Sequence, residues 1–321
     1  MALATVVHVE YSSYRRSGAR MLITEDGSWI GGVSGGCLEG DTLKKALYAI
    51  HKNEIVKVTY DTRDDDPSQI GIGLGCNGLI DVLIVPIIEK DNPIEVLKKV
   101  IDRRIPSTLV TSLLDGNTKD YTYNSCQNKL LSKYILDAQS KIKSCKIDLD
   151  EGYFIEIIPP EIVLFVFGKN YDVIPLAKIT KNIGWKIKVI ANPQKTSKDI
   201  YNLADEVLHP SKPLADIDYY SAALLMSHDY KTDKENLIKL QAFDLKYIGL
   251  LGPKKRKDKM LDELQKVGVT IITNNLYGPM GLDTGANSPE EIAVSILAEI
   301  RCCFEDREGG RLRDRQGHIH N

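Results

Sequence analysis

Residues 162–190 read IVLFVFGKNYDVIPLAKITKNIGWKIKVI, and this stretch decides the fold of the second half of the chain. An apolar run ends at Gly168, residues 172–182 have the spacing of an amphipathic helix, and a second apolar run follows. Strand, helix and strand in this order predict a βαβ unit with parallel strands. Further apolar runs at 222–226 and 247–251 extend the pattern, so we expect an α/β fold with a Rossmann-like, doubly wound parallel sheet.

The turn after the first of these strands is where a dinucleotide binds in such sheets. It keeps only the first glycine, Gly168, of the G-x-G-x-x-G fingerprint, because Asn170 and Val173 occupy the other two positions. Asn192 follows the second strand, where an acidic residue would bind the ribose. We therefore do not expect ordinary NAD(P) binding at this turn.

Polar residues follow the later strands of the predicted sheet. His228 comes directly after the third strand and is a candidate ligand contact, although a helix-capping turn explains the same residues. Lys254 and Lys255 begin a run of four cations in the first turn of the next helix. Positive charge there opposes the helix dipole, and a bound anion would relieve the repulsion. The alternative is a cluster that faces solvent.

The first half of the chain has its own distinctive stretch at residues 31–41, GGVSGGCLEGD. Glycines allow the backbone to approach a ligand closely, and Ser34 adds a hydroxyl beside Gly35 and Gly36. Helical spacing up to residue 52 places Cys37 near a helix N-terminus, where unpaired backbone N–H groups suit an anion and favour a thiolate. The alternative is a tight strand-to-helix turn with a buried cysteine.

A second glycine-cysteine segment, GIGLGCNG at residues 71–78, contains Cys76 and Asn77. We expect this loop to line one pocket together with Cys37, although two structural cysteines would fit the same sequence. Arg15 and Arg16 lie close to the first glycine loop in the chain, and such arginines grip phosphate or carboxylate groups. A solvated loop explains the two arginines equally well.

Length and composition bound the remaining possibilities. The chain has 321 residues, enough for two domains, and its formal charge of −2 gives no general argument for nucleic acid or an anionic membrane as a partner. No apolar run approaches a transmembrane span, so we expect a cytoplasmic protein. We divide it into a small N-terminal α/β domain at 1–90, a connecting region at 91–160, and the Rossmann-like domain with its basic tail at 161–321.

Several motifs in shared order resemble the XdhC/CoxI family of accessory proteins for molybdenum hydroxylases such as xanthine dehydrogenase. They are RRSGA at 15–19, the 31–41 stretch, GLGCNG at 73–78, MSHD at 226–229, YIGLLG at 247–252, GPMGLD at 278–283, SPEEIA at 288–293, and the GGRLR tail at 309–313.

The resemblance implies a cofactor-insertion chaperone rather than a turnover enzyme. It implies transient binding of the molybdenum cofactor (molybdopterin), support of its sulfuration with a cysteine desulfurase, and delivery to an apo molybdenum hydroxylase. Cys37 is then also a candidate metal ligand, and a homodimer is expected. The candidate cofactor-binding residues are Arg15, Arg16, Ser34, Gly35, Gly36, Cys37, Cys76, Asn77, His228, Lys254 and Lys255.

Two other classes of function remain open. One is an NAD(P)-linked oxidoreductase with a degenerate dinucleotide fingerprint. The other is an enzyme that uses Cys37 as its nucleophile, for which the sequence offers no obvious paired base, since His8 and His51 are the only histidines of the N-terminal domain.

Overall fold

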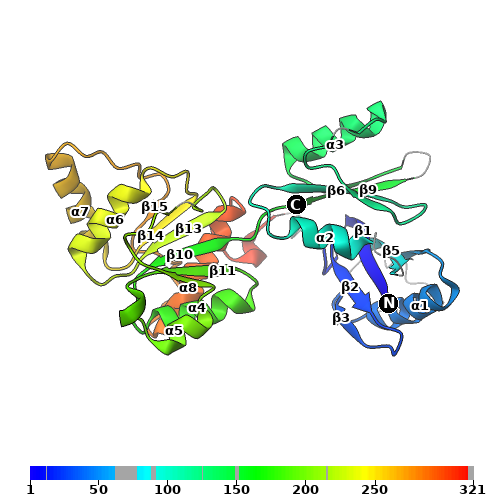
Figure 1. The fold of residues 1–321 in the computed structure, drawn as a ribbon, viewed down its shortest axis with the longest axis horizontal. Helices are drawn as coiled ribbons and strands as arrows, with labels where there is room; N and C mark the ends of the chain where they lie inside the picture. Colours follow the sequence, from blue (N-terminus) through cyan, green and yellow to red (C-terminus); the bar gives the residue numbers. More distant parts are fainter. Residues whose placement is uncertain are drawn as a thin grey trace. The chain divides into compact units, whose positions relative to one another are not determined.

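The computed structural model describes residues 1–11, 13–61, 78–87, 92–124, 126–148, 152–214 and 216–316. The chain forms two compact units (Figure 1). Unit 1 consists of Met1–Pro160 together with the chain end from Arg315, and unit 2 consists of Glu161–Asp314.

The sheet of unit 2 has six parallel strands in the spatial order β12-β11-β10-β13-β14-β15, the order of a dinucleotide-binding fold. This confirms the Rossmann-like sheet predicted from the sequence. The strands are β10 (Val163–Phe167), β11 (Lys186–Ile190), β12 (Glu206–Leu208), β13 (Ser221–Leu225), β14 (Tyr247–Leu250) and β15 (Leu276–Tyr277).

Helices cover both faces of this sheet. Alternate side chains of a strand point to opposite faces, so Leu164 and Val166 enter one core while Phe165 and Phe167 enter the other. The first core is closed by α4 (Val173–Asn182), α5 (Lys198–Leu203) and α8 (Pro289–Phe304), and the second by α6 (Tyr230–Leu240) and α7 (Lys254–Lys266). Two short 3₁₀ turns, η1 (Pro193–Lys195) and η2 (Leu312–Asp314), complete the unit.

The first sheet of unit 1 is antiparallel, with the order β3-β2-β1-β5-β4. Helix α1 packs Ala46 and Ala49 onto one face of it, against residues such as Val6 and Ile84. The elements are β1 (Ala2–Tyr11), β2 (Arg20–Ile23), β3 (Trp29–Gly31), α1 (Glu39–Lys52), β4 (Val56–Asp61) and β5 (Gly78–Pro86).

The region 91–160, treated above as a connection, builds a four-stranded antiparallel sheet with the order β7-β6-β9-β8. Val7 and Leu83 of the first sheet pack against Phe154 of this one, and Arg20 forms a salt bridge with the nearly buried Glu156. Both sheets therefore belong to one folded body. The elements are α2 (Pro93–Val100), β6 (Ser107–Ser112), β7 (Thr118–Asp120), α3 (Lys129–Lys141), β8 (Cys145–Ile147) and β9 (Tyr153–Ile158).

Candidate functional site

The carboxyl edge of the unit 2 sheet is the first candidate site. From β10 the chain crosses to β11 on one side, and β13 pairs with β10 on the other side. The helices that follow β10 and β13 lie on opposite faces of the sheet, so this is a switch point of the strand order, where ligands of open α/β sheets bind. Gly168 follows β10, and Ser227 and His228 follow β13.

A histidine and a carboxylate meet at this switch point. His228 Nε2 lies 2.7 Å from Asp172 Oδ2, although the two residues are 56 positions apart in the chain. The His228 side chain is 46% exposed and that of Asp172 only 15% exposed. The His228 imidazole is therefore open to solvent on one side, and the Asp172 carboxylate contacts it on the other.

Local backbone geometry places both side chains. A Cβ at Gly168 would lie 2.3 Å from the carbonyl oxygen of Met226, so only glycine lets the two loops approach this closely. His228 has a φ of 59°, a left-handed conformation that non-glycine residues seldom adopt. Asp172 precedes α4 but makes no capping hydrogen bond with its side chain, and its buried Oδ1 atom has no hydrogen-bond partner among the described residues.

Asp233 anchors the loop after β13. Its side chain is buried and accepts hydrogen bonds from the N–H of Ser227 at 3.2 Å and from the Ser227 hydroxyl at 2.6 Å. Arg256 Nη2 forms an ion pair with the same carboxylate at 2.6 Å. Arg256 is therefore a structural cation that ties α7 to α6, and it is not free to hold a ligand.

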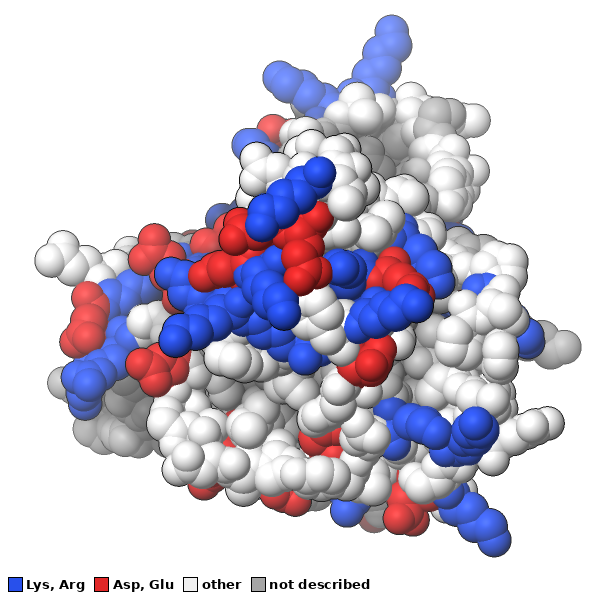
Figure 2. Space-filling view, turned by 90° about the vertical axis from the view of Figure 1, so that its left-hand side faces the viewer, with Lys and Arg blue, Asp and Glu red and all other residues white. Residues whose placement is uncertain are grey.

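Lys254 and Lys255 are exposed at the N-terminal end of α7, and neither makes a salt bridge within the described ranges. Figure 2 shows the side of the molecule on which α6 and α7 lie in Figure 1, where Lys and Arg side chains are mixed with Asp and Glu side chains. Lys234 and Lys259, for example, both lie within 4 Å of Glu263. The two lysines at the helix start are thus the cations of this face best suited to bind an anion.

The positions expected for NAD(P) are occupied differently. Val173 is fully buried at the third-glycine position, where it fills the contact between α4 and the sheet. The Asn192 side chain accepts a hydrogen bond from the N–H of Gln194 at 3.0 Å and so caps a 3₁₀ turn. The absence of tight NAD(P) binding stays a prediction, and these two contacts support it.

The glycine loop of unit 1 is organised around the hydroxyl of Ser34. The hydroxyl donates to Glu39 Oε2 at 2.5 Å and accepts from the N–H of Leu38 at 3.0 Å and of Gly36 at 3.3 Å. The N–H of Ser34 donates to Glu39 Oε1 at 2.8 Å. The loop before α1 is therefore closed by its own serine and glutamate.

Glu39 behaves as an internal anion of this loop. Burial favours the protonated acid, but the hydrogen bonds from Ser34 outweigh that effect and hold the pKa of Glu39 below its usual range. Its carboxylate accepts the N–H of Ser34, and the Ser34 hydroxyl accepts those of Gly36 and Leu38, so these backbone donors are already engaged. Binding of a second anion at these donors would require Glu39 to move.

Cys37 is half-buried in the same loop, two residues before α1 begins, with its Sγ atom 3.6 Å from the Ser34 hydroxyl oxygen. The Arg15 side chain donates a hydrogen bond from Nε to the carbonyl oxygen of Gly32 at 3.4 Å. The Arg16 side chain is exposed, and the backbone carbonyl of Arg16 accepts a hydrogen bond from the N–H of Ala19 at 3.1 Å. A Cβ at Gly35 would lie 3.1 Å from the Tyr14 ring. The structure thus brings Arg15 to the loop that carries Cys37.

Cys76 and Asn77 lie outside the described residues. In the ranges that the structure describes, no three His, Cys, Asp or Glu side chains are grouped to hold a metal ion. Metal ligation by Cys37 stays a prediction. None of the helices in the described part of the chain combines the length and apolar character needed to span a membrane.

Two residues of these sites were not singled out from the sequence. Asp172 contacts His228 only because β10 and β13 are neighbours in the sheet, which the sequence order of the strands does not show. Glu39 lies five residues after Ser34, a spacing at which a carboxylate at a helix start can reach back to the preceding loop. Its position in the first helical turn was the available signal.

Comparison with known proteins gives consistent matches for both units. The XdhC and CoxI family model matches residues 1–61, and the XdhC Rossmann domain model matches residues 164–300. A crystal structure described as a xanthine dehydrogenase from Bacillus halodurans has a TM-score of 0.78 and 31% sequence identity, over 96% of this chain and 92% of that chain.

Two curated relatives extend along most of the chain. One is a probable xanthine dehydrogenase subunit from Bacillus subtilis, 31% identical over 309 residues, which are 93% of this chain and 91% of the relative. The other is the molybdenum cofactor insertion chaperone PaoD of Escherichia coli, 22% identical over 299 residues, which are 93% of this chain and 81% of the relative. With a relative at 31% identity along nearly its whole length, the chain belongs to the XdhC and CoxI family.

Proposed function

We propose that the protein is an accessory factor that binds molybdenum cofactor, supports its sulfuration and delivers it to a xanthine dehydrogenase-type molybdenum hydroxylase. The observation that carries the proposal is similarity along most of the chain to two proteins. One is named as part of a probable xanthine dehydrogenase, and the other is named a molybdenum cofactor insertion chaperone. The client is an apo hydroxylase, and we expect the transfer to take place in the cytoplasm.

The carboxyl edge of unit 2 has chemistry that fits this cofactor. Molybdopterin carries a phosphate, and Lys254 and Lys255 are exposed cations beside the backbone N–H groups of a helix start. Its pterin ring carries N–H donors, and the buried Oδ1 of Asp172 is an acceptor that lacks a partner among the described residues. His228 lies between these groups in the strand order and offers a further hydrogen bond. When bound, the cofactor supplies the molybdenum centre that the client needs.

Unit 1 contributes the thiol in this proposal. The sulfuration step takes its sulfur from a cysteine desulfurase, and Cys37 is a free, half-buried thiol in a loop next to Arg15. We assign the phosphate to unit 2 rather than to the glycine loop, because Glu39 already occupies the backbone donor at Ser34. Cys37 then serves sulfuration rather than anchoring of the phosphate.

An NAD(P)-linked oxidoreductase is the second candidate, favoured by the strand order of the unit 2 sheet. The buried Val173 and the capping role of Asn192 argue against it. A fluorescence titration with NADH and NADPH separates the two, since only the oxidoreductase should bind either nucleotide in the micromolar range.

Reconstitution of a client tests the proposed function. An apo xanthine dehydrogenase-type hydroxylase is incubated anaerobically with molybdenum cofactor, a cysteine desulfurase and cysteine, with and without this protein. We expect the protein to raise both the pterin content and the cyanide-labile sulfur of the client, and Cys37→Ala to reduce the sulfur more than the pterin. Equal pterin content with and without the protein would contradict delivery.

A further inference from the structure

Helix α3 leaves one end of the four-stranded sheet of unit 1 uncovered. The helix packs Leu131, Ile135 and Ala138 onto the sheet against Ile155 and Ile157. It begins only at Lys129, so the hairpin end of β6 and β7 extends beyond it. A pocket of about 510 Å³ lies over this end, which is within the range of volumes that hold small organic ligands.

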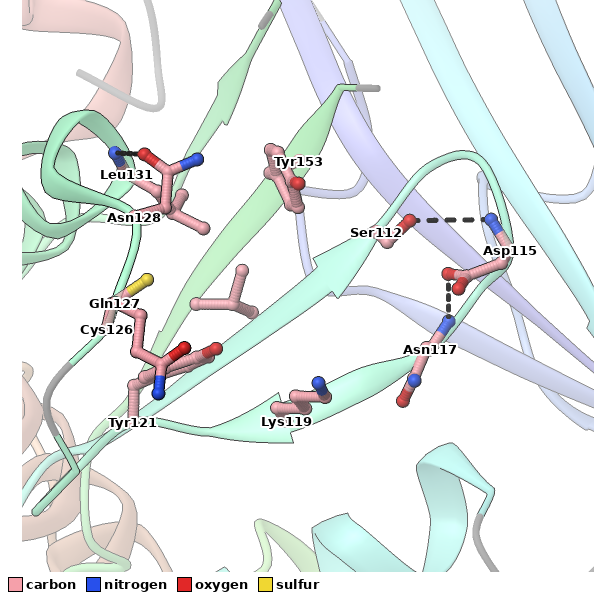
Figure 3. A pocket seen from close by; sticks show the side chains of 11 residues that line it. Ser112, Asp115, Asn117, Lys119, Tyr121, Cys126, Gln127, Asn128, Leu131 and Tyr153 are labelled. Carbon is pink, nitrogen blue, oxygen red and sulfur yellow. Dashed lines mark hydrogen bonds between the residues drawn. The ribbon is translucent and has the colours of Figure 1, made fainter. Parts of the chain in front are cut away.

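The pocket is walled by separate elements (Figure 3). Side chains of β6, β7 and β9 form the floor, the segment before α3 forms one wall, and the turn between β6 and β7 forms another. The residues lie between the two stretches matched by the family models, 1–61 and 164–300. Neither match therefore assigns a role to this pocket.

Several hydrogen-bond acceptors of the pocket are already engaged. Asp115 Oδ1 accepts the N–H of Asn117 at 3.0 Å, and Asn128 Oδ1 accepts the N–H groups of Leu130 and Leu131 at 3.0 and 3.1 Å. Ser112 Oγ accepts the N–H of Asp115 at 3.4 Å, as Figure 3 shows. These hydrogen bonds stabilise the two loops that line the pocket. The Lys119 ammonium group is the main donor that remains available to a ligand.

Lys119 is exposed and makes no salt bridge in the described part of the chain, although the nearby Asp115 carboxylate attracts it. The other acid next to it in sequence, Asp120, is held by Arg103 at 2.6 Å. The α3 N-terminus adds partial positive charge, and its first turn contains no acidic residue. Lys119 and the α3 N-terminus therefore bring positive charge to this side of the pocket, which the Asp115 carboxylate offsets only in part.

Two tyrosines give the pocket flat apolar surface. Tyr121 and Tyr153 are half-buried and line it from the sheet, beside the thiol of Cys126. A tyrosine phenol is protonated near neutral pH, and burial and the neighbouring Cys126 raise the pKa of Tyr121 further, so this side chain does not repel an anion. Aromatic faces of this kind stack on planar rings.

We propose that this pocket binds a planar heteroaromatic anion of mononucleotide size, with the anionic group at Lys119 and the ring against Tyr121 and Tyr153. The proposal concerns unit 1 only and is independent of cofactor binding at unit 2.

The probes are adenosine 5′-monophosphate, adenosine and inorganic phosphate, each titrated into the full chain by calorimetry. We expect the monophosphate to bind about tenfold more tightly than adenosine or phosphate alone, because only it uses both features of the pocket. Lys119→Ala should weaken the monophosphate about tenfold and leave adenosine unchanged. Lys133→Ala, which removes an exposed lysine of α3 outside the pocket, should change neither affinity.

A second pair of variants tests the ring contact. Tyr121→Phe keeps the ring and should keep the affinity for the monophosphate, whereas Tyr121→Leu should lower it. If Tyr121→Leu does not fold, the Lys119→Ala titration tests the proposal by itself, because Lys119 is exposed and its replacement leaves the core intact. The proposal fails if the monophosphate does not bind, or if Lys119→Ala binds it like the parent. It also fails if Lys254→Ala/Lys255→Ala abolishes binding, because the ligand would then occupy unit 2.

Discussion

His228 Nε2 and Asp172 Oδ2 lie 2.7 Å apart and join the loop after β13 to the loop after β10. Both loops are at the point where the strand order of the sheet diverges. The contact therefore fixes the orientation of an exposed imidazole where a Rossmann-like sheet binds its ligand. The pair is one part of the proposed cofactor site, and Lys254 and Lys255 are the other.

Asp172→Asn should reduce retention of molybdenum cofactor, because the amide keeps the size of the side chain but removes its charge and one of its two acceptor oxygens. The unfolding temperature should change little, since the contact to the half-exposed His228 is near the surface. Pterin bound after desalting is the measurement. Asp199→Asn in the first turn of α5 is the control, and equal retention by both variants would argue against a role for Asp172.

Gly168→Ala should destabilise unit 2 by about 1–3 kcal/mol, because the added Cβ would lie 2.3 Å from the carbonyl oxygen of Met226. The matched change is Gly40→Ala in the first turn of α1, where a Cβ would meet nothing within 4 Å. Thermal unfolding followed by circular dichroism should show a lower midpoint for the first variant only. Equal midpoints would mean that the β10 and β13 loops have room to separate.

Glu39 should contribute stability that depends on pH. The Ser34 hydrogen bonds hold the folded-state pKa of Glu39 below its ordinary value in spite of burial, so the unfolded chain takes up the proton first. The contribution is complete above the unfolded pKa, about 4.3, and is lost as the pH falls through the lower folded-state pKa. Urea midpoints measured from about pH 6 down to about pH 3 should therefore converge for the parent and Glu39→Gln.

The control for this series is Glu290→Gln, which also changes a glutamate in the first turn of a helix. Glu290 makes no hydrogen bond comparable with those of Glu39 among the described residues. Its variant should follow the parent at every pH. A constant difference between the parent and Glu39→Gln across the series would mean that the Ser34 contact does not depend on the charge.

Alkylation should label Cys37 before Cys145 and Cys303. Burial raises the pKa of the latter two thiols, which lowers their thiolate fraction near neutral pH. Cys37 lies instead in the loop before α1, beside the Ser34 hydroxyl. Brief treatment with iodoacetamide followed by peptide mass spectrometry gives the order. Labelling of Cys145 or Cys303 ahead of Cys37 would remove the argument for Cys37 as the reactive thiol.

The strands β10, β11, β13 and β14 and the helix α4 of unit 2 are predicted from the sequence because each has a local signal. The apolar runs at 222–226 and 247–251 correspond to β13 (Ser221–Leu225) and β14 (Tyr247–Leu250), and the turn at Gly168 leads into α4 as expected. His228 stands at the end of β13 for the same reason. Contacts that depend on the neighbours of a strand have no such local signal.

Asp172 and Asp233 illustrate this limit. Asp172 follows β10 and contacts His228, which follows the neighbouring strand β13. Asp233 is buried and forms an ion pair with Arg256, one of the four consecutive cations at 254–257 that look alike in the sequence. In unit 1, β7 and β8 have only three residues each, and the sheet order β7-β6-β9-β8 depends on strand pairing that no local pattern shows. Pairing of this kind is decided by packing against the first sheet.

The most direct test of the proposed function is cofactor retention. The protein is incubated anaerobically with molybdenum cofactor, desalted, and its bound pterin quantified at low and high salt. Lys254→Ala/Lys255→Ala is compared with Lys178→Ala/Lys181→Ala, which removes two exposed lysines of α4. We predict that the parent and the α4 variant retain pterin, and that the α7 variant loses most of it, as the parent does at high salt. Absence of bound pterin from the parent at low salt would contradict the account.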